Sequence, residues 1–195
     1  MTKSKKKYRR KQQKQFPVVP IAVGLLLMGF AIILATASPK TEGDAATSNS
    51  VVPMEVSYAA PELSLQNING ETEALADYHD QVVLVNNWAT WCPPCRAEMK
   101  SIEKVYNEYK DHGLVVLAVD MTYQDDPTKI APFVAEQGLT FPILLDESGA
   151  VGKSYQLRSL PSSYFINRDG IINEVVIGGP MAEALLRTRV EEILK

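Results

Sequence analysis

The tightest restriction on the fold comes from the run Trp91-Cys92-Pro93-Pro94-Cys95 and its two flanks. Before the run, Val82–Val85 is a continuous apolar stretch, which predicts a strand buried on both faces. After it, residues 93–111 place apolar side chains on one helical face, and proline is favoured in the first turn of a helix. The two cysteines therefore fall where a buried strand leads into a helix.

Strand and helix patterns alternate through the rest of the folded region. Further strands are expected at 63–68, 114–119, 141–145, 163–167 and 171–177, and further helices at 127–137 and 181–194. The turn sequences Asn69-Gly70 and Arg168-Asp169-Gly170 predict hairpins. This order predicts an α/β fold in which a central mixed β-sheet is flanked by helices and the first crossovers are parallel and right-handed.

Charge is divided unevenly along the chain. The net charge is −3, but residues 1–37 contain eight Lys or Arg and no acidic residue, which leaves 12 bases against 23 acids in residues 38–195. An acidic C-terminal part without a basic stripe argues against nucleic-acid binding. The basic residues at the start are better explained as an orientation signal for the apolar segment that follows them.

That segment, Val18–Ala35, is eighteen residues long and carries no charge. As a helix it spans roughly 27 Å, close to the roughly 30 Å of bilayer hydrocarbon. We therefore predict a signal-anchor helix over residues 17–37, with the basic segment 1–16 in the cytoplasm and the remainder outside the membrane. A cleaved signal peptide is the alternative, because Ala35-Thr36-Ala37 resembles a cleavage site, but its apolar region is usually about 7–15 residues.

Two further parts follow the predicted anchor. Residues 38–60 are rich in small and polar residues and show neither a helical nor a strand period, so we expect a flexible spacer. Residues 61–195 are enough for one compact domain and too few for two. The predicted protein crosses the cell membrane once and has one extracytoplasmic domain.

The cysteine pair is where chemistry is expected. A thiol at the first turn of a helix faces the positive end of the helix dipole and unpaired backbone N–H groups, both of which favour the thiolate. A mixed disulfide formed by Cys92 is within reach of Cys95, which can resolve it. A purely structural disulfide is an alternative. A metal site is another, although the two histidines, His79 and His112, stand at unrelated spacings.

The two prolines between the cysteines predict the direction of electron flow. Neither Pro93 nor Pro94 has a backbone N–H, so only amides from Cys95 onward can donate to the thiolate of Cys92. We therefore expect the pKa of Cys92 to be lowered less than in a strongly oxidising protein, and the couple to be comparatively reducing. This favours a reductase of protein disulfides.

The chain resembles the thioredoxin superfamily over roughly residues 60–195. The resemblance rests on the stretch VVLVNNWATWCPPCRAEM, a Leu160-Pro161 pair before the strand SSYFI, the RDG turn and a final helix. More closely, the N-terminal anchor, the WCxxC form of the motif and Glu98 resemble the membrane-tethered TlpA/ResA-like thiol–disulfide oxidoreductases. The resemblance implies a thioredoxin-like fold.

The resemblance also implies roles for single residues. Cys92 matches the attacking thiol and Cys95 the resolving thiol, and Pro161 matches a proline that is cis in the family. Glu98 matches an acid thought to tune proton transfer, with an ordinary solvated charge as the alternative. The site of substrate contact would be Leu160, Pro161 and Trp91, although Trp91 could equally serve packing, as is expected of Trp88.

One departure from ordinary thioredoxin concerns the buried acid six residues before the first cysteine. Here that position is Asn86, which cannot accept a proton. If the resolving thiol needs a local base, Glu98 is the best candidate, although water could serve instead.

Function and partners follow from the same resemblance. No G-x-G-x-x-G motif follows a strand, so no nucleotide or flavin cofactor is expected, and electrons should come from a membrane donor of the CcdA type. The implied substrate is a protein disulfide, with apocytochrome c in cytochrome c biogenesis as one candidate. The alternatives are a reductase for another exported protein, a disulfide-forming oxidase and a tethered binding module. A peroxidase is disfavoured, because Ala89 stands where such an enzyme has Thr.

Overall fold

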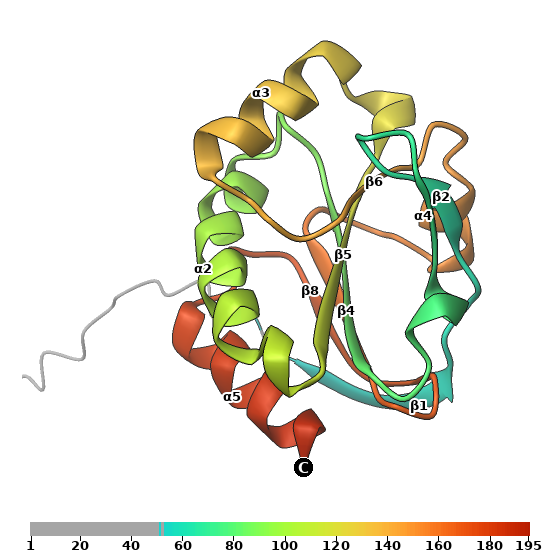
Figure 1. The fold of residues 1–195 in the computed structure, drawn as a ribbon, viewed down its shortest axis with the longest axis vertical. Helices are drawn as coiled ribbons and strands as arrows, with labels where there is room; N and C mark the ends of the chain where they lie inside the picture. The colour runs from blue at the N-terminus through green and yellow to red at the C-terminus, as the bar shows by residue number, and fades with distance from the viewer. Residues whose placement is uncertain (1–50, 52) are drawn as a thin grey trace, which may run out of the picture. The chain divides into compact units, whose positions relative to one another are not determined.

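The centre of the fold is a six-stranded mixed β-sheet, seen in the computed structural model, which describes residue 51 and residues 53–195 (Figure 1). The strands lie in the order β1-β8-β7-β4-β5-β6. Strands β4, β5 and β6 run parallel, whereas β7, β8 and β1 add antiparallel pairs on the other side of β4. Their bounds are Met54–Ala59 for β1, Val82–Trp88 for β4, Leu114–Asp120 for β5, Ile143–Leu145 for β6, Ser162–Ile166 for β7 and Ile171–Ile177 for β8.

The central strands are buried on both faces, as predicted. All seven residues of β4 and all seven of β5 are buried. Their side chains alternate between two apolar clusters, so that Leu84 and Val116 lie in one and Val85 and Leu117 in the other. A parallel pair of strands needs such cover on both sides, which explains why the sequence shows continuous apolar runs there instead of alternation.

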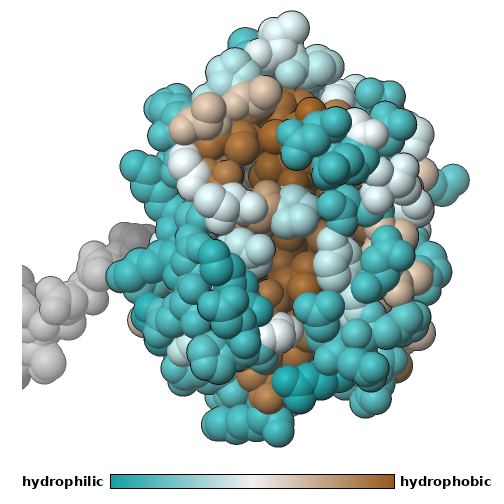
Figure 2. Space-filling model, in the orientation of Figure 1, coloured by the Kyte–Doolittle hydropathy of each residue, from teal (hydrophilic) through white to brown (hydrophobic). Residues whose placement is uncertain are grey.

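Helices cover the two faces unequally. Helices α2 (Pro93–Tyr109), α3 (Pro127–Gln137) and α5 (Glu183–Leu194) contribute apolar side chains to the first cluster. The short helix α4 (Ala150–Ser154), which the sequence analysis does not anticipate, packs on the second cluster together with the segment before β4. In the view of Figure 1, hydrophilic side chains cover most of the surface, and apolar ones gather in its middle near α3 and beside α2 (Figure 2).

The predicted hairpin at Asn69-Gly70 is confirmed. It joins β2 (Ser64–Gln66) to β3 (Thr72–Ala74) in an antiparallel pair, followed by a 3₁₀ turn at Leu75–Tyr78. Gly70 has a φ of +82°, which favours glycine, and the side chain of Asn67 accepts hydrogen bonds from the amides of Asn69 and Glu71.

The boundary predicted for the spacer is wrong within the described residues. Residues 54–59, which the sequence analysis places in the flexible segment 38–60, form the edge strand β1 against β8. Met54, Val56 and Tyr58 alternate with Glu55 and Ser57, which is a short strand pattern, but five of the six residues are exposed. Backbone pairing with β8 forms the strand, and the folded domain therefore begins before Pro61.

The predicted basic segment and signal-anchor, residues 1–37, lie outside the described residues. Among the residues that the structure does describe, no helix is long and apolar enough to cross a membrane.

Candidate functional site

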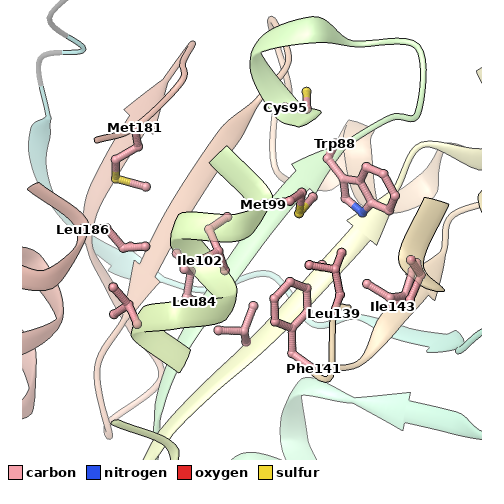
Figure 3. Close-up of a cluster of buried hydrophobic side chains, with 14 of the residues drawn as sticks. Leu84, Trp88, Cys95, Met99, Ile102, Leu139, Phe141, Ile143, Met181 and Leu186 are labelled. Carbon is pink, nitrogen blue, oxygen red and sulfur yellow. The ribbon is translucent and has the colours of Figure 1, made fainter. Parts of the chain in front are cut away.

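The two cysteines form a disulfide at the start of helix α2. Cys92 is the N-cap residue and Cys95 lies in the first turn, with an S–S distance of 2.08 Å. Both are buried in the apolar cluster under α2. Figure 3 shows Cys95 at the beginning of this helix, one turn before Met99 and near Trp88 of strand β4. The sequence pattern thus located the site correctly at the junction of a buried strand and a helix.

The supply of backbone N–H groups to Cys92 is as small as the prolines predict. Pro93 and Pro94 occupy the first two helical positions and have no amide hydrogen. The amide of Cys95 donates to Sγ of Cys92 at 3.3 Å, whereas the amide of Arg96 donates to the carbonyl oxygen of Cys92. One backbone hydrogen bond therefore reaches the sulfur of Cys92.

The Leu160-Pro161 peptide is cis and lies at the same end of the sheet as the disulfide. Strand β7 begins directly after Pro161 and runs antiparallel to β4, so that Ser162 pairs with Asn87 near the end of β4 that leads to Cys92. Leu160 is partly buried and Pro161 is buried, and the carbonyl oxygen of Pro161 accepts a hydrogen bond from the amide of Gly178 at 2.8 Å.

Glu98 is buried, with 1% of its surface exposed, and is therefore not an ordinary solvated helix charge. One carboxylate oxygen accepts from Nδ2 of Asn86 and the other from the amide of Met181, both at 2.9 Å. Burial raises the pKa of Glu98 to about 7, while these two hydrogen bonds act to lower it. Glu98 follows Cys95 by three residues on α2, so the two share a helix face.

Asn86 connects Glu98 to the sheet. It is fully buried in β4, and its Nδ2 also donates to Oγ of Ser163 in β7 at 2.9 Å. Asn86 stands where ordinary thioredoxin has its buried acid, and Glu98 is the acid predicted to replace it. The structure places the two side chains in direct contact.

The two tryptophans have different environments. Trp88 is fully buried and packs on Phe133 of α3 with ring centroids 5.2 Å apart, as predicted. Trp91 is 54% exposed, and its Nε1 donates to the carbonyl oxygen of Gln124 at 3.0 Å. Trp91 also borders a surface cavity of about 610 Å³, whose floor includes Phe133 with the guanidinium of Arg96 over its ring. The hydrogen bond thus fixes the indole N–H of Trp91, while the face of the ring stays accessible to a partner.

A second buried carboxyl group escaped the sequence analysis. Asp120, the last residue of β5, is fully buried, and Oγ1 of Thr122 donates to it at 2.8 Å. Burial and the neighbouring carboxyl of Asp125 raise the pKa of Asp120 to about 8. Asp125 in turn accepts from the amide and the hydroxyl of Thr90, in the loop that leads to Cys92. An acid directly after a buried parallel strand was the signal that could have revealed it.

Residues 53–195 contain no group of three or more His, Cys, Asp or Glu that could hold a metal ion.

The sequence gives no signal for the turn that lies beside Glu98. This turn contains Gly179 and Met181, which are more than 80 residues away along the chain, and only the fold brings them to Glu98.

A mixed sheet with a Cys-x-x-Cys disulfide at the start of a helix, and a cis proline before the neighbouring strand, defines a thiol–disulfide oxidoreductase of thioredoxin-like fold. A thiol:disulfide interchange protein of the thioredoxin family from Chlorobium tepidum TLS has the same fold, with a TM-score of 0.66 and 21% identity over 73% of this chain and 99% of that one. The AhpC/TSA family model matches residues 56–175, and the chain belongs to this family.

Bacterial proteins that are similar in sequence agree with this class. The chain is 38% identical over 132 residues to the thioredoxin-like protein YneN of Bacillus subtilis, covering 67% of this chain and 76% of YneN. It is 33% identical over 142 residues to the thiol-disulfide oxidoreductase ResA of Bacillus thuringiensis subsp. konkukian, covering 73% of this chain and 78% of that protein. The predicted thioredoxin-like fold and thiol–disulfide oxidoreductase activity are confirmed.

Proposed function

We propose that this thiol–disulfide oxidoreductase is tethered to the cell membrane by residues 17–37 and reduces protein disulfides on the outer side. The observation that carries the direction is the single backbone N–H that reaches Sγ of Cys92. Fewer donors stabilise the thiolate less, and a less stabilised thiolate makes the disulfide form relatively more favourable. Such a dithiol gives its electrons away more readily than one in a strong oxidant.

The reaction begins with Cys92. Its thiolate attacks one sulfur of the substrate disulfide, the substrate S–S bond breaks, and the released substrate thiolate takes up a proton. Cys95 then gives its proton to the carboxylate of Glu98 and attacks Sγ of Cys92. The second substrate sulfur leaves as a thiolate and takes up the proton from Glu98. The substrate has gained two electrons and two protons, and the chain returns to the Cys92–Cys95 disulfide seen in the structure.

Glu98 suits the proton step for a physical reason. A carboxyl group with a pKa of about 7 is partly charged and partly protonated at neutral pH, so it can both accept and return a proton. Its burial beside the helix face of Cys95 keeps it from bulk water. Asn86 cannot take this role, because an amide does not titrate.

The docking surface in this proposal has two parts on either side of the disulfide. The backbone of Leu160 can pair with an extended polypeptide, whereas Pro161 has no N–H and its carbonyl oxygen already accepts from Gly178. The exposed face of Trp91 offers apolar area to the same partner. An unfolded apoprotein fits this surface, and apocytochrome c is the candidate that the ResA resemblance supports.

Re-reduction requires a dithiol donor, and a CcdA-type membrane protein is the donor that the same resemblance supports. Thiol labelling of intact cells with a membrane-impermeant maleimide, after mild reduction, tests the location. Labelling of Cys92 without cell lysis is expected, and labelling only after lysis would contradict the extracytoplasmic assignment.

Activity is tested by reduction of insulin disulfides with the full-length chain in detergent micelles. Wild type should reduce insulin, Cys92→Ser should not, and activity in Cys92→Ser at the wild-type rate would reject the nucleophile. A redox titration should place the couple nearer the about −270 mV of thioredoxin than the about −120 mV of a strong oxidant, which is the value that a disulfide-forming oxidase would show.

The substrate is identified by trapping. In Cys95→Ser, the mixed disulfide on Cys92 cannot be resolved and should accumulate on the physiological partner. A trapped apocytochrome c would support cytochrome c maturation. A different exported protein would assign another reductase role, and no trapped protein would favour a binding module.

A further inference from the structure

The turn between strand β8 and helix α5 is tied to two separate parts of the site. Gly178, just after β8, donates its amide hydrogen to the carbonyl oxygen of Pro161 at 2.8 Å. Met181, two residues before α5, donates its amide hydrogen to Glu98 at 2.9 Å. Figure 3 places Met181 beside helix α2, on the side away from Trp88. Residues 178–181 therefore connect the loop before β7 to the buried carboxyl group of α2.

Gly179 lies in the middle of this turn, where no side chain has room. A Cβ added to Gly179 would lie 2.6 Å from Cγ of Pro161 and 2.8 Å from Oε2 of Glu98. Its backbone does not require glycine, since its φ lies outside the left-handed region. The adjacent Gly178 differs, because its φ is +84° and an added Cβ would meet nothing within 4 Å. Glycine is needed at position 178 for the backbone conformation of the turn, and at position 179 for the close approach to Pro161 and Glu98.

We propose that Gly179 is a positioning residue that lets one turn lie against Pro161 and the carboxyl group of Glu98 at once. The amide of Met181 can then reach one carboxylate oxygen while the ring of Pro161 is supported from the same side. The inference rests on the roles that the proposed function gives to Glu98 and Pro161. It adds a residue that neither the motif nor the cysteine spacing indicates.

The consequence for Glu98 has a definite sign. A methyl group at position 179 pushes Oε2 away from the amide of Met181 and removes a hydrogen bond that favours the charged carboxylate. The added methyl also desolvates the carboxylate further, so both effects raise the pKa of Glu98. The hydrogen-bond partners of Glu98 are Asn86 of β4 and Met181, neither of which titrates, and Cys95 of α2 is held in the disulfide. In the oxidised protein, therefore, no hydrogen-bond partner of Glu98 changes its own charge while Glu98 titrates.

The test compares Gly179→Ala with Gly152→Ala in the oxidised full-length chain in detergent micelles. Gly152, in α4, also has a φ outside the left-handed region and a close buried neighbour, Sδ of Met121 at 3.2 Å from an added Cβ. The carboxyl ¹³C signal of Glu98, assigned by its loss in Glu98→Gln, is followed against pH. Gly179→Ala should shift the midpoint upward by about one pH unit, and Gly152→Ala should leave it unchanged.

A second readout separates the two contacts. Insulin reduction by Gly179→Ala should show a several-fold rise in KM because the ring of Pro161 is displaced. That rise should persist in the Glu98→Gln background, while the shift of the pH profile should vanish there. A Gly179→Ala midpoint equal to wild type, or an equal shift in Gly152→Ala, overturns the inference.

Unfolding free energies test the same inference if Gly179→Ala is too unstable for the titration. The loss of unfolding free energy caused by Gly179→Ala should be smaller in the Glu98→Ala background, because the clash with Oε2 is then gone. An equal loss, or no folded protein in that background, overturns it. The titration needs no enzymatic activity, so its failure is distinct from failure of the proposed function, which wild-type insulin reduction tests alone.

Discussion

Glu98 and Asp120 are both buried carboxyl groups at the active-site end of the sheet, yet their partners differ. Each oxygen of Glu98 accepts an N–H, from Asn86 and from Met181. Asp120 accepts from Thr122 on one oxygen, whereas its other oxygen is buried without a hydrogen-bond donor. Burial raises the pKa of both, to about 7 for Glu98 and about 8 for Asp120.

The different partners of Glu98 and Asp120 show that burial alone does not make a carboxyl group suitable for proton transfer. Two N–H donors partly offset the burial of Glu98, so it changes charge near neutral pH. The neighbouring carboxyl of Asp125 adds to the effect of burial, so the pKa of Asp120 is raised to about 8 and Asp120 keeps its proton at neutral pH. Asp125 then holds the loop before Cys92 through Thr90. We expect Glu98 to act in the reaction and Asp120 to act in the fold.

The largest difference is expected in catalysis. Glu98→Gln removes the proton acceptor and should slow insulin reduction at neutral pH by on the order of 100-fold, the range of general acid–base effects. Asp120→Asn, which keeps the shape of the side chain and removes its titrating group, should reduce insulin at close to the wild-type rate. Steady-state assays of both variants check this, and equal losses would erase the distinction between the two carboxyl groups.

The next effect concerns the charged member of the Asp120–Asp125 pair. Hydrogen bonds from Thr90 lower the pKa of Asp125, against its partial burial. Thr90→Val removes a 2.6 Å hydrogen bond to a carboxylate and should cost about 1–2 kcal/mol in urea unfolding, less than a fully buried charged bond because Asp125 is only partly buried. Thr128→Val, which removes a similar bond to Asp126 on the surface, is the control and should cost less.

The pH dependence of stability separates the two buried acids. Both bind protons more tightly in the folded than in the unfolded state, so the unfolding free energy should fall as pH rises above about 4. The fall due to Glu98 ends near pH 7, whereas that due to Asp120 continues to about pH 8, at up to about 1.4 kcal/mol per pH unit. The stabilisation from Asp125, whose pKa is lowered, is lost only at acidic pH.

Asp120→Asn should therefore remove most of the fall in urea-derived stability between pH 7 and 8, and Glu98→Gln should remove a smaller part, because Glu98 is only partly protonated at pH 7. Unfolding of the oxidised proteins at half-unit pH steps measures both. A flat wild-type profile over this interval would show that Asp120 is already ionised in the folded protein.

The smallest effect is expected at Thr122. Because Asp120 is protonated at neutral pH, its bond from Thr122 joins two neutral groups, and Thr122→Val should cost about 1 kcal/mol. The loss should be smaller than that in Thr90→Val. The reverse order would mean that the negative charge lies on Asp120 instead of Asp125.

Local patterns predicted much of the fold and the centre of the site. Valine-rich runs, the prolines at the start of α2 and the Asn-Gly turn act over a few residues, so their outcome is readable from neighbours in the chain. The strand β1 was missed because its alternation of Met54, Val56 and Tyr58 with polar residues is short, and pairing with β8 instead of burial forms the strand. Asp120 was missed because its place at the end of a buried strand shows where the acid falls, but not whether the surrounding fold leaves it solvated.

The sequence by itself determined that two cysteines, with no N–H between them, stand at the first turn of a helix after a buried strand. Proline chemistry and helix geometry are local, and no distant contact can restore the two missing donors. Only the tertiary structure decided that Glu98 is desolvated, that the amide of Met181 reaches it, and that Gly179 lies against both Glu98 and Pro161. The contacts of Glu98 with the turn at residues 178–181 join segments about 80 residues apart, and desolvation is a property of the whole packed domain.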